Sequence, residues 1–197
     1  MKNFIKKSVY ATFLLFTMVV VAQEQYEAAT ASSKVNWKGS KPTGEHYGKV
    51  ALKDGHFKVA NGMIVGGEFN IDMNSIVVED LPQDDKYNAK LVNHLKSDDF
   101  FGAATYPLAH FNVTSTEKKG DQTLIKGDLK IKEKTHSISF LADVSVSDKN
   151  LYLKTETFTI DRSKWDIKYK SQSFFSDLGD KFISDDIELS VVVEANK

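Results

Sequence analysis

The sequence predicts an all-β fold with one short helix, an extended antiparallel β-barrel of about eight strands. Alternation of apolar and polar residues with a period of two recurs along most of the 197-residue chain. Polar turn signals separate the alternating runs. Closing such a sheet into a barrel removes its exposed edges. A sandwich of two sheets is the alternative, because periodicity alone does not separate the two architectures.

The clearest strand is the run 136–146, whose even-numbered positions are apolar after His136. Two-residue hairpin signals occur at Asp54-Gly55 and at Asn61-Gly62. The first predicts a turn between strands at 48–53 and 56–60, and the second a turn before a strand that runs to residue 76. The same alternation predicts further strands around residues 35–37, 109–113, 123–131, 151–160 and 187–193.

Residues 85–101 break the alternation. Tyr87, Leu91 and Leu95 lie four positions apart, which is helical spacing, and Asp85 or the aspartate before it can cap the first turn. This segment therefore predicts the one helix. A second irregular segment, 163–181, is long for a hairpin loop, and loops of this length usually carry function or form lids.

The N-terminal segment is typical of a secretory signal peptide. Three lysines precede an almost wholly apolar run, residues 9–21, which closes on the small residue Ala22. The run is shorter than the roughly 20 residues of a membrane-spanning helix, so an uncleaved anchor is the disfavoured alternative. We expect a signal peptide over 1–22 with cleavage after Ala22, a flexible lead-in over 23–33 and one domain over 34–197. The exported protein would then have no stable membrane insertion.

The composition argues against several classes of function. The chain has no cysteine, which excludes disulfides, a thiol nucleophile and a thiolate metal site. Its formal net charge is -1, and without the leader it has 23 basic and 27 acidic residues, a net charge of −4. This balance argues against nucleic acid as a partner. An exported chain without disulfides must be stabilised by its core.

The motifs of common enzyme classes are missing from the sequence. No two of the five histidines lie two, three or four positions apart, so no local metal-ligand pair exists. There is no nucleophile elbow, phosphate-binding loop or dinucleotide fingerprint. The acid pairs Asp98-Asp99 and Asp185-Asp186 stand at element ends, where acids usually cap or face solvent. We expect no catalytic residue, no metal and no cofactor. The alternative is a metal site assembled from residues on distant strands.

Arg162 is the only arginine, against 25 lysines. The planar guanidinium group of arginine presents several hydrogen-bond donors in a fixed geometry, which lysine cannot replace. One interpretation is a structural ion pair with Asp161, Asp180 or Asp185. The other is a contact with a ligand headgroup at the mouth of a pocket.

Two phenylalanine pairs, Phe100-Phe101 and Phe174-Phe175, lie outside the predicted strands. Ordinary core packing is one interpretation, because most buried aromatic residues belong to the core. The functional interpretation is that they line an elongated apolar channel.

An ordered set of short motifs resembles the YceI-like family. No single motif is decisive, but the ordered set is specific. It includes the run 94–101, His-Leu-Lys-Ser-Asp-Asp-Phe-Phe, followed by Tyr106-Pro107 and the strand at Phe111. The resemblance covers about residues 34–194, and Glu133-Lys134 depart from the family's glycine turn. Further matching segments are 35–39, 44–48, 66–76, 127–132, 161–165 and 178–180.

The resemblance implies an extended, lipocalin-like barrel in the periplasm that holds an isoprenoid lipid or isoprenoid quinone in a hydrophobic interior. It implies a binding or carrier protein and not an enzyme; a homodimer is a further expectation. On this basis the headgroup end would involve Arg162 and Tyr169. The candidate lining residues, all aromatic, are Phe100, Phe101, Phe111, Phe140, Phe158, Trp165, Phe174 and Phe175.

Two other functions stay open at this level. The first is an enzyme that acts on a lipid or a small apolar substrate inside the same barrel. The second is a purely structural envelope protein, whose barrel would be filled by side chains and would have no channel.

Overall fold

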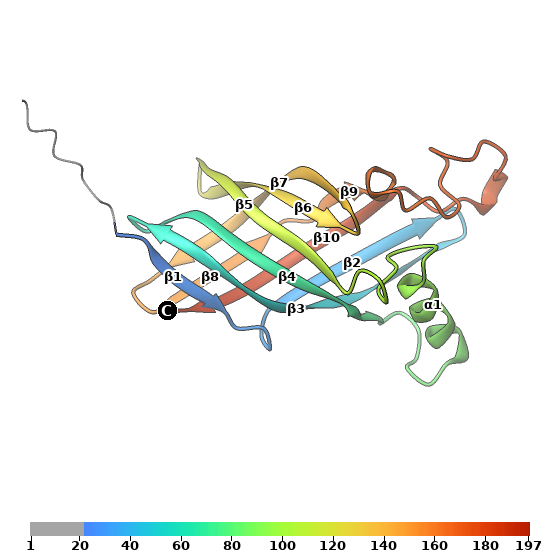
Figure 1. The fold of residues 1–197 in the computed structure, drawn as a ribbon, viewed down its shortest axis with the longest axis horizontal. Helices are drawn as coiled ribbons and strands as arrows, with labels where there is room; N and C mark the ends of the chain where they lie inside the picture. The colour runs from blue at the N-terminus through green and yellow to red at the C-terminus, as the bar shows by residue number, and fades with distance from the viewer. Residues whose placement is uncertain (1–21) are drawn as a thin grey trace, which may run out of the picture.

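Ten antiparallel strands form one sheet that closes into an elongated barrel (Figure 1). The computed structural model describes residues 22–197, so the expected leader lies outside the described residues except for Ala22. The strands and the helix are β1 Glu24–Ala28, β2 Lys34–Lys41, β3 Gly44–Ala60, β4 Met63–Val78, α1 Lys86–Lys96, β5 Leu108–Lys119, β6 Gln122–Ile131, β7 Lys134–Val146, β8 Asn150–Thr155, β9 Phe158–Asp161 and β10 Asp186–Asn196.

Strand β10 closes the ring. It pairs with β2 on one side and with β8 and β9 on the other. The short strands β1 and β2 both lie beside β3, and β8 and β9 share a second position beside β10. Ten strands therefore occupy eight positions around the barrel. The predicted all-β, eight-stranded barrel with one helix is confirmed, and the sandwich alternative is excluded.

The expectation of a flexible lead-in over 23–33 needs a correction, because β1 occupies part of this range. Glu24 to Glu27 pair with β3, and Ala28 pairs with β10. Tyr26 is buried, and its hydroxyl donates a hydrogen bond to the Ser147 carbonyl at 2.8 Å. Five residues with a single buried aromatic give too short an alternation to recognise, and the partners that order them are far away in sequence.

The two hairpin signals have different outcomes. Asn61-Gly62 forms the turn between β3 and β4, with φ of 52° and 73°. Asp54-Gly55 forms no turn, because β3 continues through it to Ala60 with an irregular register against β4. A Cβ on Gly55 would lie 2.3 Å from the Phe69 ring, so this glycine serves close packing between two strands.

The predicted helix is confirmed as α1, and the Asp85 side chain accepts a hydrogen bond from the Tyr87 amide at 2.8 Å. Helix α1 lies at one end of the barrel, together with the irregular segment 162–184 (Figure 1). The start of β1 and the C-terminus lie at the opposite end, where Lys197 Nζ is 2.7 Å from Glu24 Oε1. The barrel therefore has two chemically different ends.

Candidate functional site

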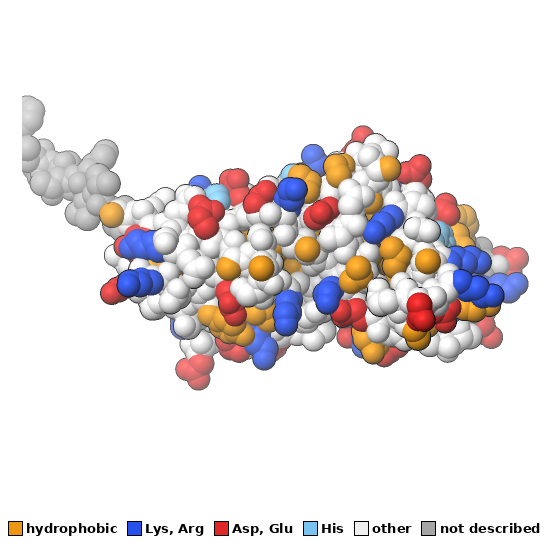
Figure 2. All heavy atoms as spheres, turned by 90° about the horizontal axis from the view of Figure 1, so that it is seen from below, with side chains coloured by type: hydrophobic (Ala, Val, Ile, Leu, Met, Phe, Trp, Pro, Cys, Tyr) orange, Lys and Arg blue, Asp and Glu red, His pale blue; other side chains and the backbone are white. Residues whose placement is uncertain are grey.

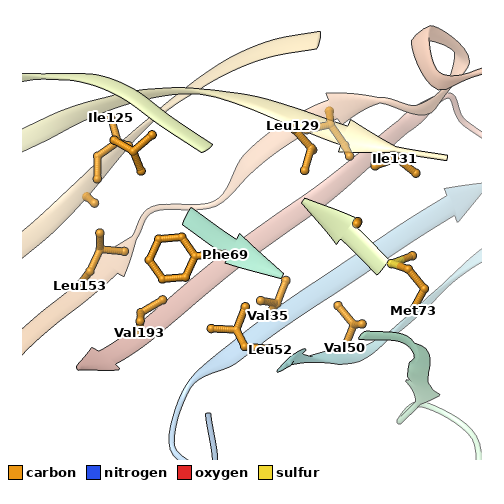
Figure 3. Close-up of a cluster of buried hydrophobic side chains, with 14 of the residues drawn as sticks. Val35, Val50, Leu52, Phe69, Met73, Ile125, Leu129, Ile131, Leu153 and Val193 are labelled. Atoms are coloured by element: carbon orange, nitrogen blue, oxygen red, sulfur yellow. The ribbon is translucent and has the colours of Figure 1, made fainter. Parts of the chain in front are cut away.

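The barrel encloses a cavity of about 310 Å³ whose wall is almost wholly apolar. Alternate residues of each strand point inward because side chains alternate across a sheet. Figure 3 shows ten of these lining side chains converging on the interior from six strands. They are Val35, Val50, Leu52, Phe69, Met73, Ile125, Leu129, Ile131, Leu153 and Val193. A cavity of this size contradicts the purely structural alternative, which required a filled barrel.

The end that carries the chain termini is closed by side chains. Five residues there are nearly inaccessible to solvent and do not line the cavity, so they fill the barrel below it. They are Tyr26, Val59, Ile64, Leu151 and Ala195. The cavity is therefore sealed at this end, which we call the closed end.

The other end is the mouth of the cavity. The polar residues that line the cavity all come from this end: Ser40, Lys41, His46, Arg162 and Ser184. Lys41 is exposed, so the cavity reaches the surface here. We call this the open end.

An inward-facing glycine widens the open end. Gly39 lies opposite His46 on β3 and Ile187 on β10, and it lines the cavity. A Cβ built on Gly39 would meet no atom within 4 Å. The space beside His46 is therefore free for part of a ligand.

Six of the ten residues predicted for the site line the cavity: Phe100, Phe101, Phe111, Phe140, Phe158 and Arg162. Phe140 and Phe158 stack with ring centroids 4.5 Å apart, and Phe111 lies 5.7 Å from Phe140. Strand β7 pairs with β8 only from Ala142 onward, so the Phe140–Phe158 stack covers the part of the wall where β7 has no paired neighbour on that side in the described structure. These side chains both complete the wall and shape the cavity.

The other four predicted residues do not line the cavity, which corrects the prediction. Trp165 is buried in the wall, where its indole N–H donates to the Leu129 carbonyl at 3.1 Å. Tyr169 packs outside the cavity, with its ring 5.6 Å from Phe100. Phe174 and Phe175 lie in the loop after them and are 42% and 50% exposed. Residues in an irregular segment have no alternation to fix their direction, so the sequence could not separate these cases.

Arg162 fits both predicted interpretations in part, because it forms a structural ion pair and also lines the cavity at its mouth. It is only 1% exposed, and it lines the cavity. Its Nε, Nη1 and Nη2 donate to the carbonyls of Ser184, Ile167 and Ile183 at 3.0, 2.6 and 3.0 Å. Nη2 also lies 3.3 Å from Asp185 Oδ1. With most of its N–H groups occupied, Arg162 chiefly holds the segment 162–184 against the barrel.

The carboxylate of Asp185 is part of the same network. Ser173 donates to its Oδ2 at 2.7 Å. Burial raises the pKa of Asp185, but hydrogen bonds from Ser171 and Ser173 and the charge of Arg162 outweigh that effect and hold the pKa below its usual value. The open end therefore depends on an ionised carboxylate.

His46 and Trp37 are lining residues that the sequence reasoning missed. His46 Nδ1 lies 2.7 Å from Asp80 Oδ2, and the Tyr47 amide donates to Asp80 Oδ1 at 3.0 Å. Burial raises the pKa of Asp80, but these two hydrogen bonds outweigh it and lower the pKa. The buried indole nitrogen of Trp37 has no hydrogen-bond partner within the described structure. Both side chains share the inward parity of the strand residues beside them, which was the signal available in the sequence.

Residues 22–197 contain neither a clustered metal site nor a membrane-spanning helix. No group of three or more histidine, aspartate or glutamate side chains is arranged to hold a metal ion in that range. No helix there is long and apolar enough to cross a membrane.

The chain is similar to proteins of one sequence family. The family described as YceI-like domain matches residues 26–195. Protein YceI of Escherichia coli O157:H7 is 30% identical over 149 residues, which cover 75% of this chain and 72% of that protein. A UPF0312 protein of Vibrio campbellii is 31% identical over 145 residues, covering 70% and 74% of the two chains.

Solved structures show the same barrel at lower identity. Burkholderia cenocepacia BcnA has a TM-score of 0.63 and 20% identity, with 85% of this chain and 99% of that chain covered. A polyisoprenoid binding domain from Saccharophagus degradans has a TM-score of 0.61 and 15% identity, with 87% and 97% covered. At these identities the similarity shows the fold alone.

Proposed function

The chain belongs to the YceI-like family, and we propose that it is an exported, non-catalytic carrier of an isoprenoid lipid, either a polyprenyl lipid or an isoprenoid quinone. The observation that carries the proposal is the cavity itself, about 310 Å³, apolar along its wall and sealed at one end. The similarity to a polyisoprenoid binding domain supports the ligand class. The N-terminal signal supports export to the periplasm.

The chemistry of the cavity suits a long apolar tail with one polar end. Each buried CH₂-sized unit contributes about 0.8 kcal/mol, so a tail in the apolar interior supplies most of the affinity. The tail would extend toward Leu153 and Val193, and the headgroup would stay at the open end near Lys41 and His46. A preformed cavity needs few polar contacts for this task.

The enzyme alternative has less support. His46 with Asp80 resembles an oriented general base, but a covalent mechanism also requires a nucleophile in hydrogen-bond reach of that base. No serine hydroxyl hydrogen-bonds to His46 among the described residues, although Ser40 and Ser184 also line the cavity.

The first test identifies what the protein carries. Protein purified from its native host is denatured, extracted with organic solvent and analysed by mass spectrometry. We expect an isoprenoid lipid in a stable proportion to protein. The proposal fails if repeated preparations yield no such lipid and if added menaquinone with four isoprene units does not raise the melting temperature.

The second test uses the free space at the open end. Gly39→Leu places a side chain where nothing lies within 4 Å, so the barrel should fold while the mouth is narrowed. We expect the affinity for the same menaquinone to fall at least about tenfold, or 1.4 kcal/mol. Gly66→Leu is the matched control, because Gly66 does not line the cavity and its Cβ would meet only Lys58, at 3.7 Å. Equal losses in the two variants would contradict the assignment of the mouth.

A further inference from the structure

The loop 168–182 is anchored at the mouth of the cavity. The Ile183 amide donates to the Lys170 carbonyl at 2.9 Å, and the Ser184 amide donates to the Ser40 carbonyl of β2 at 2.9 Å. Ser173 is tied to Asp185, which pairs with Arg162. Ser184 and Arg162 also line the cavity. The base of this loop, which we call the rim loop, is therefore fixed beside the opening.

The tip of the rim loop presents two aromatic side chains to solvent. Phe174 and Phe175 are 42% and 50% exposed, although phenylalanine is usually buried. Lys168 Nζ lies 4.9 Å from the centroid of the Phe174 ring. In a space-filling view, lysine or arginine and hydrophobic side chains lie next to each other at this end of the molecule (Figure 2). An apolar tip with adjacent lysines is the pattern of segments that bind at a membrane interface.

The charge of this segment differs from that of the whole chain. The rim loop carries three lysines against two aspartates, whereas residues 22–197 carry 23 basic against 27 acidic residues. The tip therefore meets an anionic lipid surface with less repulsion than the rest of the molecule would.

The exposed aromatic area fits a bilayer better than a second copy of the chain. A phenylalanine buries roughly 150–250 Å² when fully covered, so two half-exposed rings offer about 200 Å². A stable protein interface needs roughly 800 Å² from each partner. A small apolar tip is instead sufficient for a weak, reversible contact with lipid.

We propose that the rim loop docks the open end on an anionic phospholipid bilayer through Phe174 and Phe175, so that the mouth faces the membrane. This inference rests on the proposed function, because a carrier of an isoprenoid lipid must collect or release its ligand where such lipids reside. Docking requires no change in the barrel, since the tip projects beyond the residues that anchor it.

The test compares two pairs of exposed apolar residues at opposite ends. The proteins are residues 23–197, which contain every described strand and lack the apolar run 9–21 that would itself enter vesicles. Phe174→Ser with Phe175→Ser removes the tip. Met63→Ser with Val65→Ser is the matched control, because these side chains are 59% and 42% exposed at the closed end. Flotation with vesicles of phosphatidylethanolamine and phosphatidylglycerol measures binding.

We expect the tip variant to lose at least about tenfold in vesicle partitioning and the control variant to change less than about twofold. Equal losses in both variants, or no binding of the unmodified protein, would overturn the inference. A tip variant that turns a dimer into a monomer in analytical ultracentrifugation, with vesicle binding unchanged, would overturn it as well. Thermal unfolding of each variant checks that the barrel is intact.

A titration of menaquinone in solution separates this inference from the proposed function. If the purified protein carries no isoprenoid lipid and the unmodified protein does not bind the quinone, the proposed function fails, whatever the vesicles show. If the tip variant binds the quinone like the unmodified protein and also binds vesicles equally well, only the docking inference fails. We expect the tip variant to retain the quinone and lose the vesicles.

Discussion

The closed end and the open end of the barrel are held together by different interactions. At the closed end, Tyr26, Val59 and Ile64 fill the interior, and β3 is paired with β1 on one side and with β4 on the other. At the open end the interior is hollow, and the rim is held by Arg162 and Asp185. Apolar side chains pack together at the closed end, where no ligand binds. Polar contacts replace them at the open end, where the cavity must stay free for a ligand.

The largest expected effect comes from Arg162, which tests whether the rim depends on its polar network. Arg162→Met keeps the length of the side chain but leaves three carbonyls without their donor and Asp185 without its cationic partner. Breaking a buried ion pair in this way costs about 3–5 kcal/mol. Urea denaturation should show this loss in the free energy of unfolding. A loss below about 1 kcal/mol would mean that apolar packing holds the rim as well.

Two isoleucines test the contrast in packing directly. Ile64 is fully buried at the closed end, and Ile138 is half-buried and lines the cavity. Both are strand residues, so changes in strand propensity cancel between them. We expect Ile64→Ala to cost about 3 kcal/mol and Ile138→Ala about 1 kcal/mol, because the second adds space to an existing cavity. Equal losses in urea denaturation would contradict the picture of one filled and one hollow end.

Acid should weaken the open end before the closed end. The pKa values of Asp80 and Asp185 both lie below their usual value, for the reasons given above. A carboxyl with a lowered folded pKa stabilises the protein above its unfolded pKa, near 3.9, and this contribution is lost as the pH falls through the folded value. Hydrogen-exchange protection of segments 78–85 and 168–186 should therefore fall below about pH 4, while that of the closed-end strand segments around Val59 and Ile64 persists. Loss of hydrogen-exchange protection at the same pH at both ends would contradict the prediction that acid weakens the open end first.

The smallest expected effect distinguishes the two tryptophans. Trp165→Phe removes a buried N–H that is bonded to the Leu129 carbonyl, so we expect a cost of about 1–2 kcal/mol. Trp37→Phe removes a buried N–H that has no partner, so the stability should change by less than about 0.5 kcal/mol. Thermal unfolding of the two variants side by side measures the difference. A larger cost for Trp37 would show that its indole nitrogen is bonded after all.

The sequence predicted those elements whose signal is local. The alternation in 136–146 marks nearly all of β7, Asn61-Gly62 marks a real turn, and Asp85 caps the helix as expected. Asp54-Gly55 gave a wrong turn prediction, because the glycine serves a different purpose: it leaves room for the ring of Phe69 on another strand. Strand β1 was missed because it is ordered by β3 and β10, which are distant in sequence.

Strand parity accounts for only part of the predicted site, because Phe100, Phe101 and Arg162 also line the cavity from outside the strands. Phe111, Phe140 and Phe158 lie on strands and line the cavity. Phe174, Phe175 and Trp165 lie in an irregular segment, where the same residue type can face the core, the wall or solvent. Only tertiary contacts decide between those outcomes, and no single-sequence pattern records them.

The pairing of β10 with strands from both ends of the chain sets the order of events in biogenesis. No complete ring exists until residues 186–196 are available, because they join β2 to β8 and β9 and also meet β1. A chain that is still being made is thus an open sheet with two unsatisfied edges. Its last strand, β10, decides when those edges disappear, so the ring closes only after synthesis of the chain is almost complete.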